Sequence, residues 1–251
     1  MEKFTYRLST ISSLIVTPRA NLALYVDLKD FSGNQIQENS QFLLKKNLKV
    51  IYPFYQYGEY DGYNPSGASY YLPGSSLKGA LCQKKYKTSK IMVDDVLIPN
   101  DDIVLRNIFK AQYLEEENEA CISEFFDKVG VEMIKAGVEL VGEIYLEGLP
   151  AFKELIDEAK KSTQIKINQM LDYLYELETK NYKEGMKTKL HKVSKQLSLL
   201  QDISDDVLLL GGYKGLLHSM ELNSNQDDIT GAVYVDPETD LPHGIIKLEL
   251  I

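Results

Sequence analysis

Two short segments combine glycines with a single lysine, which is a composition suited to phosphate binding. The first reads PGSSLKGAL over residues 73–81, and the second reads LLLGGYKGLL over residues 208–217. Small residues let backbone N–H groups approach a phosphate, a following helix adds the positive end of its dipole, and lysine adds a point charge. The first segment is not a nucleoside-triphosphate loop, because its lysine precedes its glycine. Tight turns with solvated lysines remain the structural alternative for both.

Charge is unevenly distributed along the chain. The net charge is -9, from 28 basic and 37 acidic residues, and this alone argues against a nucleic-acid partner. The segment from Gly62 to Val93, however, holds five lysines and no acid, and the segment from Lys183 to Gln201 holds five lysines and one acid. Acids gather elsewhere, in 94–102 and 115–117. The pattern favours a basic face and an acidic face, although the lysines could simply solvate a surface.

The usual catalytic and metal-binding patterns are missing from the sequence. The three histidines, His191, His218 and His243, form no His-x-x-x-His pair, and Cys82 and Cys121 form no Cys-x-x-Cys. We therefore expect no metal and no cofactor. No Gly-x-Ser-x-Gly elbow is present, and no base accompanies a serine next to glycine. The two distant cysteines, both expected to be buried, fit a reducing, cytoplasmic protein. The sequence shows neither a secretory signal nor a membrane span.

Periodicity predicts an α+β protein. Extended segments are expected at 4–16, 23–28, 103–114 and the end of the chain, with a hairpin around Gly137 within 129–147. A helix is expected over 76–86, capped by Ser75 or Ser76. Two further helices follow Pro150 and are separated by Gly185. Residues 40–49 could be a strand or a helix, and the tyrosine-rich loop 51–71 must pack on something.

Several of these segments together resemble a known family. YLPGSSLKGAL is similar to the signature of the RAMP proteins, the RNA-recognition-motif-like subunits of CRISPR effector complexes. VLRNIFKAQYLEE, VEMIKAGVELVGEIYL and LLLGGYKGLLHSM follow in the order expected for that family. The order, with helices inserted before the last loop, most resembles the fifth subunit of the type III-A (Csm) complex. The resemblance covers roughly the whole chain.

The resemblance implies a ferredoxin-like fold in two partly merged domains. Residues 1–148 would form the N-terminal RAMP domain, and residues 149–251 a helical insertion with a smaller RAMP-like part. The implied function is non-catalytic binding of the guide RNA (crRNA), capping the backbone of the complex near the 3′ part of the guide and aiding its maturation or assembly, in antiviral defence. Partners would be other RAMP subunits and, indirectly, target RNA, with no membrane.

The residues that the resemblance assigns to guide RNA lie in both glycine segments. They are Gly74, Ser75, Ser76, Lys78 and Gly79 in the first, and Gly211, Gly212, Lys214 and Gly215 in the second, with Lys84 and Lys85 in the adjoining basic stretch. The His-Ile-Gly of many members is absent, and VTPRANLALYVD stands in its place. Arg19 in that stretch could bind phosphate instead. The aromatic pair that stacks bases in ordinary RNA-recognition motifs has no clear match.

Two other functions remain open. Backbone subunits that cleave target RNA use an aspartate in a loop near the N-terminus, and Asp27 or Asp30 lies near that place. The chain would then be a metal-dependent endoribonuclease, unless both are ordinary surface acids. Without the resemblance, the glycine loops could also belong to an enzyme that binds a small phosphorylated molecule.

Overall fold

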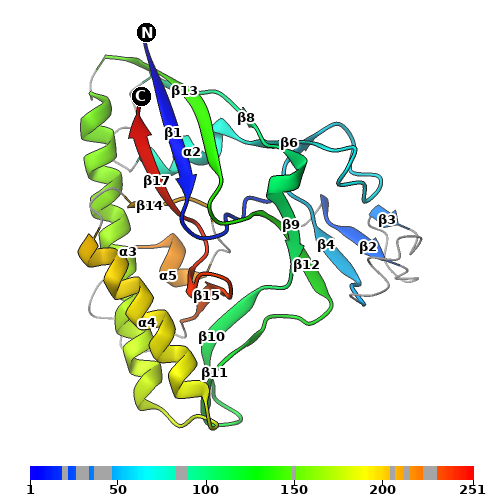
Figure 1. Ribbon diagram of the computed structural model, residues 1–251, viewed down its shortest axis with the longest axis vertical. Coiled ribbons are helices and arrows are strands. Elements are labelled where there is room, and N and C mark those ends of the chain that lie inside the picture. Colours follow the sequence, from blue (N-terminus) through cyan, green and yellow to red (C-terminus); the bar gives the residue numbers. More distant parts are fainter. Residues whose placement is uncertain are drawn as a thin grey trace.

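The computed structural model describes residues 1–18, 22–26, 34–36, 47–82, 90–148, 151–203, 207–211, 215–222 and 231–251. Its elements form a mixed α+β architecture in which most strand pairs are antiparallel (Figure 1). In the part of the chain that the structure describes, no helix is both long enough and apolar enough to cross a membrane.

The main sheet has five antiparallel strands in the order β14-β17-β1-β13-β7. They are β14 (Val207–Leu209), β17 (Ile245–Leu250), β1 (Glu2–Thr10), β13 (Glu139–Glu147) and β7 (Lys90–Val93). Helix α2 (Gly74–Leu81) precedes β7, and helix α3 (Phe152–Thr179) follows β13. Without the edge strand β14, the arrangement is β-α-β-β-α-β with order 4-1-3-2. This topology is consistent with a ferredoxin-like fold.

Alternation along β1 sets the two faces of this sheet. Tyr6 and Leu8 are buried, whereas Lys3 is exposed, as a half-buried strand requires. The buried side packs against α2 and the first turns of α3 in one core. Gly142 lies opposite Tyr6 in β13, and a Cβ there would come 2.3 Å from the Tyr6 hydroxyl. The glycine therefore makes room for the tyrosine ring inside the core.

Three smaller sheets are inserted into this scaffold. One has the order β3-β2-β4-β12-β9, another β11-β10-β15-β16, and the third β5-β6-β8. Their strands are β2 (Leu24–Val26), β3 (Asn34–Ile36), β4 (Val50–Tyr52), β5 (Gln56–Tyr57), β6 (Ser69–Leu72), β8 (Val96–Leu97), β9 (Ile103–Arg106), β10 (Phe109–Leu114), β11 (Glu119–Glu124), β12 (Val129–Ile134), β15 (Val233–Asp236) and β16 (Leu241–Pro242). The 3-10 helix η3 (Asn100–Asp102) precedes β9.

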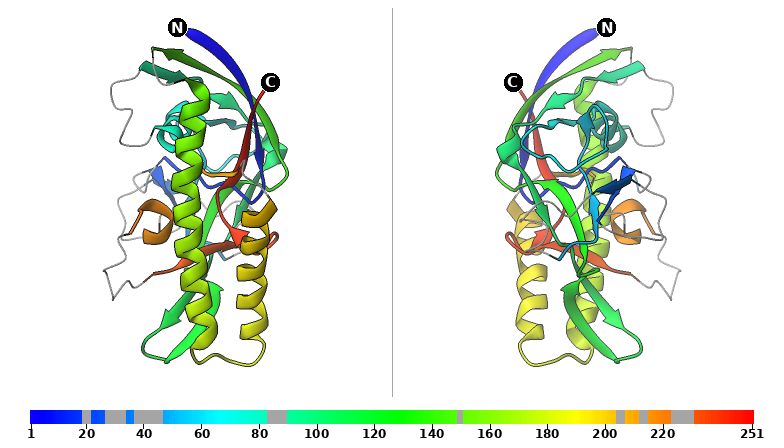
Figure 2. Two further views of the ribbon diagram at one scale, coloured as in Figure 1. Left: turned by 90° about the vertical axis from the view of Figure 1, so that its left-hand side faces the viewer. Right: turned by 90° about the vertical axis from the view of Figure 1, so that its right-hand side faces the viewer.

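The helical region after residue 150 agrees with the periodicity. Helices α3 and α4 (Met186–Ile203) pack side by side, as the views of Figure 2 show. Gly185, with φ +79°, stands between them. Buried residues recur at steps of three and four, and they face a core shared with β10 and β15: Ile167, Met170, Leu174 and Leu177 on α3, and Leu190, Val193 and Leu197 on α4. The boundary expected after residue 148 falls between β13 and α3, and strands from both sides of it share the main sheet.

The hairpin predicted around Gly137 is wrong. The segment is extended on both sides of a turn, but β12 pairs with β4 and β9, whereas β13 pairs with β1 and β7. The Gly137 N–H donates to the carbonyl of Thr10, and the Lys135 N–H to that of Asp102. The turn therefore carries the chain from one sheet to another, which alternation of side chains cannot reveal.

Other local predictions need smaller corrections. The strand expected over 4–16 ends at Thr10, and Leu14 makes only an isolated bridge to Ile134. Extended structure over 103–114 is confirmed by β9 and β10. Cys121 is buried, but Cys82 is only half-buried. Most of 40–49 lies outside the described residues.

The tyrosine-rich loop packs on a buried carboxylate. Glu132 of β12 is 1% exposed, and its oxygens accept hydrogen bonds from the Tyr70 hydroxyl at 2.6 Å and the Phe54 N–H at 2.9 Å. Burial raises the pKa of Glu132 above its ordinary value, and these donors oppose the rise. The expectation that these tyrosines pack on something is confirmed.

Candidate nucleic-acid interface

The first glycine segment forms α2, directly after β6. Leu77 and Leu81 are buried against the main sheet, while Ser75, Lys78 and Gly79 are exposed. Positions three and four apart lie on the same side of a helix, so these three residues share its outer face. Among the described residues, Lys78 forms no ion pair. The arrangement presents a hydroxyl, an ammonium group and a bare stretch of backbone together.

Gly74 has a different role from Gly79. It is buried, and its N–H donates to Asp95 Oδ1 at 2.8 Å. A Cβ at Gly74 would lie 2.0 Å from the carbonyl oxygen of Val93, whereas a Cβ at Gly79 would meet nothing within 4 Å. Packing therefore explains the first glycine, and nothing in the described part of the protein requires the second.

The N-cap predicted for this helix is wrong. Helix α2 begins at Gly74 with Pro73 as its N-cap, and neither Ser75 nor Ser76 fills that position. The carboxylate of Asp95, distant in sequence, bonds the first N–H group instead. Local sequence could not reveal a cap supplied by the loop between β7 and β8.

The second glycine segment packs against the chain after β1. Gly211 has φ +60°, and a Cβ there would lie 2.4 Å from the Ile15 carbonyl oxygen. Gly215 precedes the short helix α5 (Leu216–Ser219), and a Cβ there would lie 2.9 Å from the Tyr234 ring. Both glycines thus have packing reasons for their size. Asp27 and Asp30 lie outside the described residues. So do five of the candidate RNA-binding residues: Arg19, Lys84, Lys85, Gly212 and Lys214.

Helix α3 connects the two segments. Leu77 and Leu81 of α2 share a core with Phe152, Leu155 and Ala159 at the start of α3. Leu217 of α5 packs with Ile167 and Met170, further along the same helix. With a rise of about 1.5 Å per residue, the two segments are spaced on the order of 15 Å apart along α3.

The open face of the main sheet is electrically self-compensated. Four cations and four carboxylates lie on it, in the pairs Lys3–Glu143 (2.6 Å), Lys247–Glu249 (2.7 Å), Lys90–Glu147 (3.2 Å) and Arg7–Glu139 (4.0 Å). The Tyr145 hydroxyl donates to Glu143 as well. Phosphate binding needs uncompensated cations, and base stacking needs free aromatic rings. Within the described residues, this face offers little of either.

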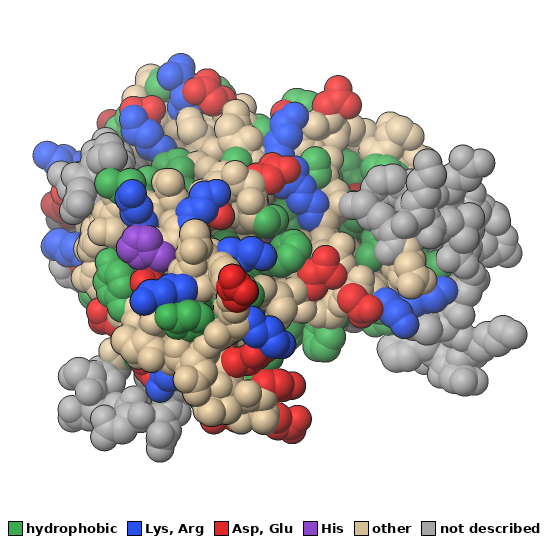
Figure 3. Space-filling model, turned by 60° about the horizontal axis from the view of Figure 1, so that its bottom comes forward, with side chains coloured by type: hydrophobic (Ala, Val, Ile, Leu, Met, Phe, Trp, Pro, Cys, Tyr) green, Lys and Arg blue, Asp and Glu red, His purple; other side chains and the backbone are tan. Residues whose placement is uncertain are grey.

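Only some of the lysines within residues 183–195 are available to bind phosphate. Lys183 pairs with Glu119 at 2.9 Å and Lys192 with Asp240 at 2.6 Å, whereas Lys189 and Lys195 form no ion pair within the described residues. In Figure 3, basic and acidic side chains are interspersed over this end of the molecule. The second basic stretch is thus a mixed surface in the folded protein.

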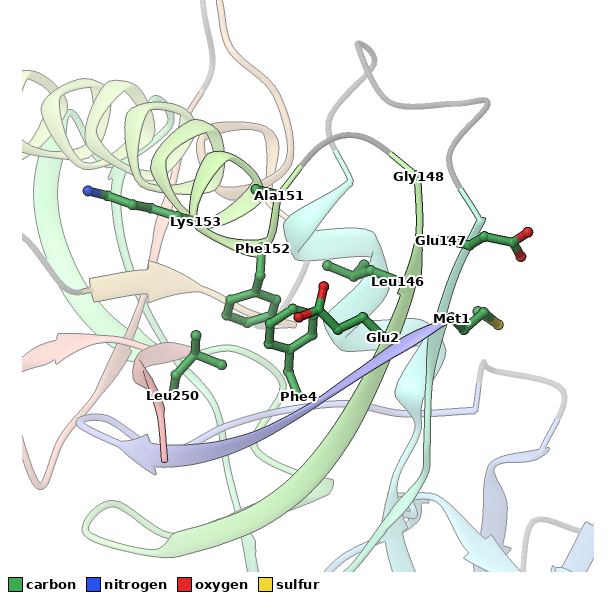
Figure 4. A pocket seen from close by; sticks show the side chains of 10 residues that line it. All are labelled: Met1, Glu2, Phe4, Leu146, Glu147, Gly148, Ala151, Phe152, Lys153 and Leu250. Atoms are coloured by element: carbon green, nitrogen blue, oxygen red, sulfur yellow. The ribbon is translucent and has the colours of Figure 1, made fainter.

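An open groove of about 520 Å³ lies where β1 and the start of α3 meet. Phe4 and Phe152 stack in it with ring centroids 5.4 Å apart, and Leu250 lines the groove beside them (Figure 4). None of the candidate RNA-binding residues that the structure describes lines this groove.

A buried polar cluster beside the second segment escaped the sequence analysis. Ser13 Oγ lies 2.8 Å from His243 Nδ1, and the Ser13 N–H donates to Asp236 Oδ2 at 2.9 Å. The carboxylate thus bonds the serine backbone rather than the imidazole, so the three residues do not form a Ser-His-Asp relay. Burial lowers the pKa of His243 to about 4 and that of nearby His218 to about 3. No motif in the sequence marks these residues as neighbours.

Comparisons with known proteins add little. No family model and no curated protein sequence matches the chain. One similar solved structure is described as the cryo-EM structure of a Csm–crRNA–target RNA ternary complex in a type III-A CRISPR-Cas system. The match has 14% sequence identity and a TM-score of 0.38, and it covers 63% of this chain and 48% of that one. The match thus spans about half of that chain, and a similarity this low carries no functional argument.

The two glycines of α2 should respond oppositely to alanine. Gly74→Ala places a methyl group against the Val93 carbonyl and should lower the free energy of unfolding by about 2 kcal/mol. Gly79→Ala enters open space in a helix and should raise it by up to about 1 kcal/mol. Urea denaturation of both variants measures this difference. Equal destabilisation by the two changes would contradict the packing described here.

The buried histidines should make stability depend on pH. The pKa of His218 is about 3 in the folded protein against an ordinary 6.5, so below 6.5 only the unfolded chain takes up the proton. The contribution of His218 to stability is therefore constant above 6.5 and is lost as the pH falls toward 3. As the pH falls through this window, the free energy of unfolding of His218→Leu should rise relative to that of the wild type. The expected gain is up to about 1.4 kcal/mol per pH unit. Urea titrations at several pH values test this, and a constant difference would refute it.

Proposed function

We propose that this protein is a non-catalytic, guide-RNA-binding subunit of a type III-A (Csm) CRISPR complex, with the RAMP form of the ferredoxin-like fold. The observation that carries the proposal is the place of PGSSLKGAL. It forms the first helix of a β-α-β-β-α-β arrangement, with Ser75, Lys78 and Gly79 on the exposed side. The ordered resemblance of three further segments to the family supports it.

The outer face of α2 suits contact with an RNA backbone. Lys78 supplies a point charge, Ser75 a hydrogen-bond donor, and Gly79 a place where the backbone of another molecule could come close. Gly79 has no packing reason to be glycine among the described residues, so contact from outside the protein explains its small size. No side chain on this face suits reading base edges, so binding should not depend on guide sequence.

The RNA path we propose follows the loops rather than the open sheet face. The paired charges of that face leave little net attraction for phosphate, whereas α2 and the second glycine segment both lie along α3. Ser76, Lys84, Lys85 and Arg19 would extend the contact, together with Gly211, Gly212, Lys214 and Gly215. In the complex, the subunit would cap the backbone near the 3′ part of the guide, bind other RAMP subunits and meet target RNA indirectly, as a cytoplasmic component of antiviral defence.

Removal of the Lys78 charge should weaken RNA binding without regard to sequence. Lys78→Ala should lower affinity for guides of any sequence, and the dependence of log K on log salt should fall by roughly 0.7 for each phosphate that the variant no longer neutralises. Guide retention by the assembled complex over a salt series measures both quantities, with thermal unfolding as the folding control. Unchanged affinity and slope would mean that Lys78 is merely solvated.

Gly79 tests the close approach separately from charge. Gly79→Val keeps every charge and its Cβ meets no described atom of the protein, so thermal stability should hold while guide retention falls. Gly79→Ala, with its smaller side chain, is the matched control and should cause a smaller loss. If both variants retain the guide as well as the wild type, RNA does not lie against this helix.

The alternative function is target-RNA cleavage by Asp27 or Asp30 with a metal ion. We propose that neither aspartate is catalytic. Asp27→Ala and Asp30→Ala should therefore leave target-RNA cleavage by a reconstituted complex intact. Loss of a cleavage product in either variant, with assembly unaffected, would favour the endoribonuclease.

A further inference from the structure

The three-stranded sheet β5-β6-β8 exposes an apolar outer face. Tyr70 and Leu72 of β6 point into the protein, so the residue between them, Tyr71, lies on the other side. Tyr71 stands opposite Leu97 of β8, which is 66% exposed, and beside Tyr57 of β5, which is 53% exposed. We call Tyr57, Tyr71 and Leu97 the tyrosine face.

The tyrosine face is built from stacked rings on a fixed base. The rings of Tyr57 and Tyr71 are nearly parallel, with centroids 4.2 Å apart and planes at 16°. The Tyr55 ring also packs against Tyr71, with the two ring centroids 5.7 Å apart. The neighbouring Tyr70 is anchored to the buried Glu132, so β6 cannot easily shift. The Tyr57 ring is therefore held outward and keeps much of its surface free.

The surroundings of the tyrosine face are acidic. Residues 50–77 and 91–105, which form this sheet and its loops, contain no lysine or arginine. Asp95 Oδ2 accepts a hydrogen bond from the Tyr57 hydroxyl at 3.4 Å. Glu59 and Asp61, which follow Tyr57 closely in the chain, are exposed, and within the described residues they form no ion pair. Among the residues that the structure describes, Lys135 is the only cation paired with an acid of these loops, and it bonds Asp102 at 3.0 Å.

We propose that the tyrosine face binds an arginine-containing segment of a partner protein. A guanidinium group can stack on the exposed ring of Tyr57 while its N–H groups meet the neighbouring carboxylates. Arginine fits better than lysine, because its planar group stacks and donates in several directions at once. RNA is disfavoured here, because its phosphates would face the carboxylates without a compensating cation. The inference is independent of the proposed RNA binding by α2.

The test uses the full chain and a fluorescein-labelled arginine–glycine repeat peptide. Fluorescence anisotropy should show salt-sensitive binding to the wild type and to Tyr57→Phe, which keeps the ring. Tyr57→Leu should weaken binding about fivefold or more. Tyr175→Leu is the matched control, because Tyr175 is 47% exposed on α3, away from the acidic loops. A lysine–glycine repeat of equal charge should bind more weakly than the arginine peptide.

The carboxylates are tested in parallel with the ring. The double variant Glu59→Gln/Asp61→Asn leaves the Asp95 cap of α2 intact and should reduce both the affinity for the peptide and its salt dependence. Near-ultraviolet circular dichroism confirms that each variant is folded. Labelled oligouridylate, with the same Tyr57 variants, tests RNA as the occupant.

Three outcomes would overturn the proposal. The first is no binding of the arginine peptide at low salt. The second is equal affinity of the wild type and Tyr57→Leu. The third is Tyr57-dependent binding of oligouridylate in place of the peptide, which would assign this face to RNA bases.

Discussion

The buried carboxylate of Glu132 anchors the segment that carries both of the proposed contact surfaces. It lies on β12 and accepts hydrogen bonds from the Tyr70 hydroxyl and the Phe54 N–H, which belong to the tyrosine-rich segment. Tyr70 is on β6, and β6 leads directly into α2 and carries Tyr71 on its other side. A buried acceptor without its donors would be costly, so this contact is made in full or not at all. The Lys78 helix and the tyrosine face therefore share one anchor.

The surfaces of this protein differ in their local charge balance, which the net charge of the whole chain does not show. The open sheet face cancels its own charges, α2 presents a lysine without an ion-pair partner among the described residues, and the tyrosine face is bordered by carboxylates. Each surface therefore suits a different kind of neighbour, although the chain as a whole is acidic. The lysines of residues 183–195 show the limit of counting charges in sequence. Two of the five between Lys183 and Gln201 are neutralised by acids that lie far along the chain.

Periodicity in the sequence was enough to find the elements, but not their partners. The helical spacing of Ile167, Leu174, Leu190 and Leu197 placed α3 and α4 correctly, because amphipathic helices carry their own pattern. The turn at Gly137 was equally visible, yet its flanking strands joined different sheets, since pairing is decided by the whole fold. The sequence predicts a phosphate contact at Gly74, but it does not show the Val93 carbonyl, which already gives this glycine a packing reason. The surroundings of Glu132 and the cluster of Ser13, Asp236 and His243 were missed because burial of a polar residue depends on distant segments.

The central position of β1 also constrains the order of events during synthesis. This strand lies between β13 and β17, so its residues pair with residues 139–146 on one side and with residues 246–250 on the other. Contacts this distant in sequence slow folding, because a long loop must close before they form. The edge of β1 that pairs with β17 therefore stays unpaired until residues 246–250 have been made. Until then the nascent chain exposes an unpaired strand edge, and we expect it to need a chaperone more than a protein of local contacts does.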